Sequence, residues 1–207
     1  MIKKRRFFKK KPKSRKYCKY NKFFSYKNMD RRKRNFLYKD FSNSNSYNTK
    51  FNFSIFRYCK FYNAKIKACG LNGCIIEWTD FKSSNFNHTR FNGTVFKNVY
   101  FGDCKLTTTS FKNAKFENVI FKDNCYKRFK GIKGTFSEKE LKNIDIESLK
   151  LILKEEFSIS LLSDSDLRRL LLAFDEKTVL EALSKKKPVK INLSYIAKIV
   201  NDYKDKK

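Results

Sequence analysis

Residues 79–101 read TDFKSSNFNHTRFNGTVFKNVYF, and a phenylalanine returns within them at every fifth position. Outward from this stretch, the same spacing gives fifteen consecutive positions that hold only Phe, Ile or Leu: Phe51, Phe56, Phe61, Ile66, Leu71, Ile76, Phe81, Phe86, Phe91, Phe96, Phe101, Leu106, Phe111, Phe116 and Phe121. Two places before each stands a small residue, Ala, Cys, Ser, Thr or Val. Neither column contains a charge, although 33% of the chain is charged. A five-residue unit with two inward positions therefore organises this segment.

A period of five fits neither a helix, with its period of 3.6, nor a strand, with its period of 2. It fits a chain that turns a corner in every unit and stacks its turns. The large residue then fills the axis, and the small residue lets the walls approach each other. We predict that Phe81 and Phe101, which are 20 residues apart, lie one above the other inside such a coil.

The pattern of a small residue, any residue, Leu or Phe, and two further residues closely resembles the pentapeptide-repeat family. The resemblance covers residues 49–123 and extends loosely over 36–48, where Lys39 and Ser46 depart from the motif. It implies a right-handed quadrilateral β-helix with four units in each coil. It also implies a non-catalytic scaffold that presents a surface. The best-known members imitate DNA through acidic faces, a mechanism that the charge of this chain excludes.

The charge divides the chain into three parts. Of the 49 Lys and Arg and 20 Asp and Glu that give a net charge of +29, residues 1–40 carry 18 and 2. We predict a basic, largely flexible tail at 1–40, a pentapeptide-repeat β-helix at 41–130, and a small all-α bundle at 131–207. Self-repulsion among the tail's cations disfavours a packed structure there.

The C-terminal part has the periodicity of amphipathic helices. Ser137 to Glu140 and Ser163 to Asp166 have the spacing of capping boxes. Apolar stripes at helical spacing follow, and Lys185–Pro188 interrupts them before a last helix that we expect to start at Ser194. The sequence predicts four or five short helices packed as a bundle.

A 20-residue coil also predicts columns on the outer surface. One column is apolar, with two aromatic residues beside it: Ile55, Ile75, Val95, Tyr58 and Trp78. Exposed apolar clusters mark interaction sites. We expect the C-terminal helices or the tail of the same chain to cover this patch, and an interface with another protein or a second copy is the alternative.

The residue types needed for catalysis or metal binding do not come together in the sequence. Cys59, Cys69, Cys74 and Cys104 fall in the small inward column, where a thiol acts as a small apolar side chain. The single histidine, His88, has neither a nucleophile nor a base beside it in the pattern. No CxxC pair or phosphate-binding glycine motif is present. We expect no enzyme activity, no cofactor and no metal.

The excess of positive charge predicts an anionic partner, and nucleic acid is the leading hypothesis. Two cationic clusters would contact phosphates: Lys3, Lys4, Arg5, Arg6, Lys9, Lys10, Lys11, Lys13, Arg15 and Lys16 in the first, and Arg31, Arg32, Lys33 and Arg34 in the second. Aromatic residues interleaved with these cations favour single strands or RNA.

The alternative function is an adaptor that docks an acidic or other protein through the apolar column or the C-terminal helices. Attachment to anionic lipid ranks lowest, because the tail shows no amphipathic helix. The basic start of the chain is not followed by an apolar stretch, and no segment approaches 18 apolar residues. We therefore expect the protein to be cytoplasmic.

Overall fold

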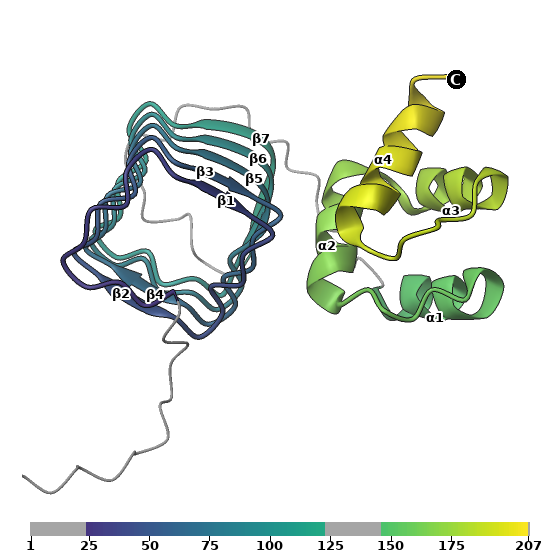
Figure 1. Cartoon of the computed structure of the whole chain (residues 1–207), viewed down its shortest axis with the longest axis horizontal. Helices are drawn as coiled ribbons and strands as arrows, with labels where there is room; N and C mark the ends of the chain where they lie inside the picture. Colours follow the sequence, from purple (N-terminus) through teal and green to yellow (C-terminus); the bar gives the residue numbers. More distant parts are fainter. Residues whose placement is uncertain (1–23, 123–145, 207) are drawn as a thin grey trace, which may run out of the picture.

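The computed structural model describes residues 24–122 and 146–206, which form a square solenoid and a group of helices beside it (Figure 1). The first cationic cluster, Lys3 to Lys16, and the capping pair Ser137 and Glu140 lie outside the described residues. The described part thus contains the whole of the five-residue pattern up to Lys122.

The solenoid contains seven strands within its described residues. They are β1 (Asn35–Leu37), β2 (Asn45–Tyr47), β3 (Ile55–Arg57), β4 (Lys65–Lys67), β5 (Ile75–Asp80), β6 (Val95–Gly102) and β7 (Lys115–Lys122). β1, β3, β5, β6 and β7 form one parallel sheet in that order, and β2 pairs with β4. Ile55 pairs with Asn35 below it and Ile75 above it, so the register advances by 20 residues in each coil. Four five-residue units per coil are confirmed.

The large residue of each unit points to the axis. Phe81 and Phe101 are both 0% exposed, and their ring centroids lie 4.8 Å apart. Phe96 and Phe116 stack with 3° between their planes. Successive rings in the same coil meet edge to face, as Phe81 does with Phe86. Stacked and edge-to-face geometries are the favourable ones for aromatic pairs, so the rings stabilise one register of the coils.

In many units the small residue has a second role, which the sequence pattern did not predict. Where it is Ser, Thr or Cys, its hydroxyl or thiol often donates a hydrogen bond to the carbonyl oxygen of the central residue 23 positions earlier, in the coil below. Thr94 Oγ1 donates to the Leu71 carbonyl at 2.6 Å, and Cys74 Sγ donates to the Phe51 carbonyl at 3.2 Å. Because a buried carbonyl without a partner is costly, these side chains tie neighbouring coils together.

The residues at the corners of the square have a left-handed backbone conformation. The residue two places after each central residue has a positive φ, between 48° and 66°, at every fifth position from Asn28 to Asn118. Asn and Gly adopt this conformation readily, whereas bulky side chains do so at a cost. Aromatic residues nevertheless hold four of these corners: Tyr38, Phe53, Tyr58 and Trp78.

The solenoid starts before residue 41, which corrects the predicted boundary of the tail. Lys27 bridges to Tyr47 and Asp30 bridges to Lys50, so residues 24–40 belong to the first coil. Ser46 takes the place of an apolar central residue and is fully buried, because it donates to the Phe24 carbonyl and accepts from the Tyr26 amide. Lys39, at a position meant for a small residue, is exposed on the rim of this end coil.

Four helices follow in the described part of the chain: α1 (Ile146–Phe157), α2 (Asp164–Ala173), α3 (Glu176–Lys185) and α4 (Leu193–Lys204). The capping box of Ser163 and Asp166 is present at the start of α2. The last helix begins slightly earlier than expected, because Asn192 rather than a serine accepts the hydrogen bond of the first turn. Leu149, Leu167, Val179 and Val200 pack in one core with Trp78 of the solenoid.

Candidate functional site

The square coil has four faces, and each five-residue unit belongs to the face of its central residue. Face 1 is centred on Phe36, Phe56, Ile76, Phe96 and Phe116. Face 2 is centred on Phe41, Phe61, Phe81, Phe101 and Phe121. Face 3 is centred on Tyr26, Ser46, Ile66, Phe86 and Leu106, and face 4 is centred on Arg31, Phe51, Leu71, Phe91 and Phe111. The labelled sheet from β1 to β7 marks face 1, and β2 and β4 mark face 3 opposite (Figure 1).

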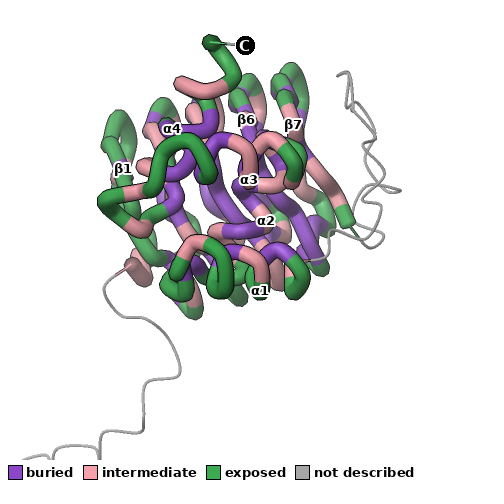
Figure 2. Tube along the Cα trace, turned by 90° about the vertical axis from the view of Figure 1, so that its right-hand side faces the viewer, coloured by how far each residue is buried: buried purple, intermediate pink, exposed green. Residues whose placement is uncertain are grey.

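The helices dock on face 2. Figure 2, which looks from the side of the helices, shows buried residues of α2 lying over buried residues of β6. Lys60 Nζ lies 3.3 Å from an Asp166 carboxylate oxygen and 3.0 Å from Ser163 Oγ. Arg168 pairs with the buried Asp80 at 3.1 Å. Polar contacts with charged partners thus fix the register of α2 on the solenoid.

Arg169 is the deepest charged group of this interface, with a side chain only 1% exposed. Its guanidinium donates to the Trp78 carbonyl at 2.8 Å and pairs with Asp166 at 2.5 Å. Burial lowers the pKa of Arg169, and the charges of Asp166 and Asp80 oppose that change. Burial also opposes ionisation of Asp166, but the hydrogen bond from Ser163 and the charge of Arg169 hold its pKa below the usual value. The Asp166 carboxylate is therefore ionised at neutral pH beside the buried guanidinium.

The predicted apolar patch is divided by a corner. Trp78 is 9% exposed and packs against Phe174, with Tyr58 stacked beneath it at 5.8 Å. The C-terminal helices of the same chain thus cover the aromatic part, as we expected. Ile55 and Ile75 are half-buried on face 1, and Val95 is 36% exposed beside them. The five residues therefore do not form one continuous surface.

A hollow of about 320 Å³ lies at the lower edge of the docked helices. Tyr38 and Lys39 of the first coil line it on one side, and Leu161 and Ile191 line it on the other. Tyr38 is 56% exposed and Leu161 is 75% exposed. The helices thus leave one aromatic corner of the first coil accessible.

The structure separates the four residues of the second cationic cluster. Arg31 takes a central position, where its guanidinium lies 4.5 Å from the centre of the Tyr26 ring. Arg32 forms an ion pair with Asp30 at 2.6 Å. Lys33 is a corner residue, and Arg34 is exposed beside it. This cluster is part of the folded coil, where Arg31 is half-buried and Arg32, Lys33 and Arg34 are exposed.

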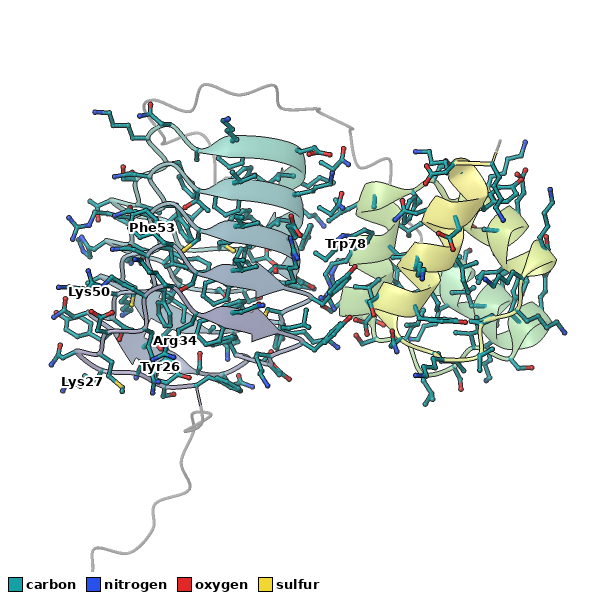
Figure 3. The ribbon with its side chains drawn as sticks, turned by 45° about the horizontal axis from the view of Figure 1, so that its top comes forward. Tyr26, Lys27, Arg34, Lys50, Phe53 and Trp78 are labelled. Carbon is teal, nitrogen blue, oxygen red and sulfur yellow. The ribbon has the colours of Figure 1, made fainter. Side chains whose placement is uncertain are left out.

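Positive charge is concentrated away from the docked helices. Within residues 24–122, faces 3 and 4 carry ten Lys and Arg and a single acid, Asp30. Faces 1 and 2 carry eight Lys and Arg and five acids. The ten cations are Lys27, Lys65, Lys67 and Lys105 on face 3 and Arg31, Arg32, Lys33, Lys50, Arg90 and Lys112 on face 4. Figure 3 shows Lys27 and Lys50 on the side opposite Trp78. On face 1, by contrast, Arg57 pairs with Glu77 and Lys97 pairs with Glu117.

The five-residue pattern is also recognised by comparison with known families. A family model described as "Pentapeptide repeats" matches in eight copies over residues 59–98, 74–113 and 84–123. Together with the square coil of 20 residues, this match decides the assignment. The solenoid is a pentapeptide-repeat domain.

Solved structures match parts of this chain at low sequence identity and low TM-score. HetL from the cyanobacterium Nostoc sp. strain PCC 7120 is 7% identical, with 46% of this chain and 43% of HetL covered and a TM-score of 0.35. Rfr23 from Cyanothece 51142 is 8% identical, with 48% and 92% covered and a TM-score of 0.31. Full-length QnrB1, described as a plasmid-mediated fluoroquinolone resistance protein, is 13% identical, with 45% and 59% covered and a TM-score of 0.25. The chain thus spans less than half of HetL. None of the curated proteins matches it.

The inward cysteines of the pentapeptide-repeat domain are buried in its core. Burial raises the pKa of Cys59 and Cys74 to about 12 and that of Cys69 to about 11, so these thiols stay protonated at neutral pH. His88 is exposed and contacts Thr108. Within residues 24–122 and 146–206, no group of three His, Cys, Asp or Glu is placed to hold a metal. Among the helices described, none is both long and apolar enough to cross a membrane.

Two features of the site were not found from the sequence. The five-residue register continues back to Tyr26 and Arg31, but the large residues two places before the central ones, such as Met29 and Arg34, hid it. Arg31 and Ser46 also interrupt the central column there. The place where α2 docks, through Arg169, depends on contacts with residues about 90 to 110 positions away, which no local spacing indicates.

Proposed function

We propose that this protein is a non-enzymatic scaffold that binds nucleic acid through faces 3 and 4 of its pentapeptide-repeat domain. The observation that carries the proposal is the uneven distribution of charge, ten cations and one acid on faces 3 and 4, neither of which is the face that the helices cover. The basic segment at residues 1–23, with 12 Lys and Arg and no acid, extends the same charge along the chain.

The geometry of the coil suits a phosphate backbone. Within a column of faces 3 and 4 the cations stand at least two coils apart, as Lys50 and Arg90 or Lys65 and Lys105 do, which is about 10 Å along the axis, twice the spacing of neighbouring strands. That interval is slightly longer than the screening length of about 8 Å at physiological salt, so each cation acts mainly on its own phosphate. Binding of this kind is mainly electrostatic, gives little sequence specificity and weakens steeply as salt rises.

The proposal is tested by a matched pair of fourfold variants. One replaces Lys50, Arg90, Lys105 and Lys112 of faces 3 and 4 by Gln, and the other replaces Lys39, Lys82, Lys115 and Lys122 of faces 1 and 2. Both remove four charges. Affinity for a labelled 20-nucleotide strand is measured by fluorescence anisotropy over a salt series.

We expect the first variant to lower the slope of log K against log salt by up to about 3, at about 0.7 for each lost phosphate contact. The second variant should retain most of the slope. Equal losses in the two variants would show that only net charge matters, and would contradict a site on faces 3 and 4. Deleting residues 1–23 leaves the first coil intact and measures how much of the affinity the basic segment contributes.

A second candidate is an adaptor that binds an acidic protein segment through the hollow beside Tyr38. Its specific support is the accessible pair Tyr38 and Leu161, with the Lys39 ammonium beside them. An acidic segment that inserts one apolar side chain would match this lining and the net charge of +29. An acidic partner retained after nuclease treatment by the parent, and lost from Leu161→Ser, would favour this candidate over nucleic acid.

A further inference from the structure

Aromatic residues at the left-handed corners are confined to two columns of the solenoid. Tyr38, Tyr58 and Trp78 form one column between faces 1 and 2. Phe53 stands alone in the other, between faces 4 and 1, where Lys33 lies one coil below and Gly73 one coil above. In the first column the aromatic corner is a binding element, because Trp78 packs into the core of the helices. Phe53 has the same backbone conformation, with φ of 60°, and no such cover.

Phe53 is held in place but remains accessible. Its ring lies against Gly73, since a Cβ added at that glycine would come within 2.7 Å of two ring atoms. Phe53 is nevertheless 61% exposed. Glycine holds the next two corners of the same column, Gly73 and Gly93, where the left-handed backbone costs nothing. A bulky ring at such a corner, open to water, points to a role in binding.

The surroundings of Phe53 are cationic. Lys50 lies three residues before it on face 4, and Lys33 and Arg34 lie in the coil below, where the Lys33 amide donates to the Asn52 carbonyl at 3.1 Å. All three side chains are exposed. The nearby acid, Asp30, is engaged by Arg32 at 2.6 Å. Figure 3 shows Phe53, Lys50 and Arg34 on the same side of the solenoid.

A planar apolar group framed by cations matches one class of ligand in particular. We infer that Phe53 is a stacking platform for an unpaired base of a single-stranded nucleic acid, with phosphates held by Lys33, Arg34 and Lys50. This inference rests on the proposed function and gives it a substrate class. In a duplex the bases are stacked on each other, so only a single strand offers a free base face to the ring.

The test compares two labelled strands with equal numbers of phosphates, a 20-nucleotide oligothymidylate and a 20-nucleotide abasic strand. The full chain is titrated with each by anisotropy. The parent should bind the base-bearing strand more tightly, by about 5-fold to 150-fold for one stacked base. Phe53→Asn should bring the ratio of the two affinities close to one, while the affinity for the abasic strand stays unchanged.

Two further variants separate stacking from folding. Phe53→Trp should retain the ratio, because Trp78 shows that a corner accepts indole. Tyr62→Asn, which removes a ring that is 52% exposed on face 2, should also retain it. A ratio that Phe53→Asn leaves unchanged overturns the inference. If the parent binds both strands equally and with a steep salt dependence, the inference fails and the proposed function stands. If neither strand binds, the proposed function itself fails.

Discussion

The two aromatic corner columns share a backbone and differ in what covers them. Tyr58 and Trp78 lie under the helices, whereas Phe53 faces water beside Gly73. The coil imposes the same positive φ on both columns, so it does not decide their roles. The side chain placed at the corner decides whether that edge binds a neighbour or stays inert. The edge with Trp78 is occupied within the chain, and the edge with Phe53 is open.

The largest loss of stability is expected when Arg169, which holds the helices against the covered corner, is replaced. Arg169→Ala leaves the Asp166 carboxylate and the Trp78 carbonyl without their partner in a buried place. Losing one member of a buried pair costs about 3–5 kcal/mol. We expect the helices to unfold at lower denaturant than the solenoid, which hydrogen exchange resolved by segment would detect. Arg34→Ala, an exposed arginine of the first coil, is the control. A single unchanged transition in Arg169→Ala would contradict the role of this contact.

Replacing the indole tests the same corner without removing a charge. Trp78→Asn keeps a residue that the solenoid already tolerates at Asn98 and Asn118, the next corners above. The lost packing against Phe174 should cost about 2–4 kcal/mol, since truncation of a buried Trp costs about 3–5 and relief of backbone strain offsets part of it. Equilibrium unfolding followed by far-UV circular dichroism measures this change. A stability equal to the parent's would show that Trp78 contributes nothing to docking.

The interface should also depend on acid pH through Asp166. Its pKa in the folded state is below the ordinary value of 3.8, so its charge stabilises the folded state above about pH 4. That stabilisation is lost as pH falls through the folded pKa, because the folded carboxylate must then bind a proton. Asp166→Asn should therefore be less stable than the parent at pH 7, by about 1–3 kcal/mol, and approach it near pH 2. Asp164→Asn, at an exposed pair with Lys150, should show little of this effect. An equal difference at both pH values would contradict the assignment.

The sequence predicted the coil because its inward columns are strictly periodic. Phe81 and Phe101 can stack only if 20 residues complete a turn, and this fixes the square section and the register together. Periodicity fails at an end coil. Lys39 and Arg34 stand at positions that elsewhere hold small residues, and both are exposed on the rim, where no described residue packs beneath them.

The candidate site was less predictable, because it depends on which faces remain uncovered. The charges of Lys50, Arg90 and Lys112 are visible in the sequence, but which faces of the solenoid stay uncovered follows from the position of the helices. That position is set by Arg168 and Arg169 against Asp80 and Trp78, a match of side chains distant in the sequence. Likewise, the exposure of Phe53 depends on the corner geometry and on Gly73.

The smallest expected change in stability is at the uncovered corner, and there we expect a gain rather than a loss. Phe53→Asn replaces a bulky residue at a positive φ by one that favours it, as at Asn43 and Asn63. Since Phe53 is 61% exposed, little packing is lost, and the solenoid should gain up to about 1 kcal/mol. Thermal unfolding of Phe53→Asn and of Trp78→Asn compares the expected gain of stability with the expected loss. Both variants place an Asn at an aromatic corner. A loss of stability in both variants would mean that Phe53 is a packing residue, and the two corners would then not differ in kind. A gain at Phe53 with a loss at Trp78 means that the exposed ring costs stability, which is the behaviour of a residue retained for binding.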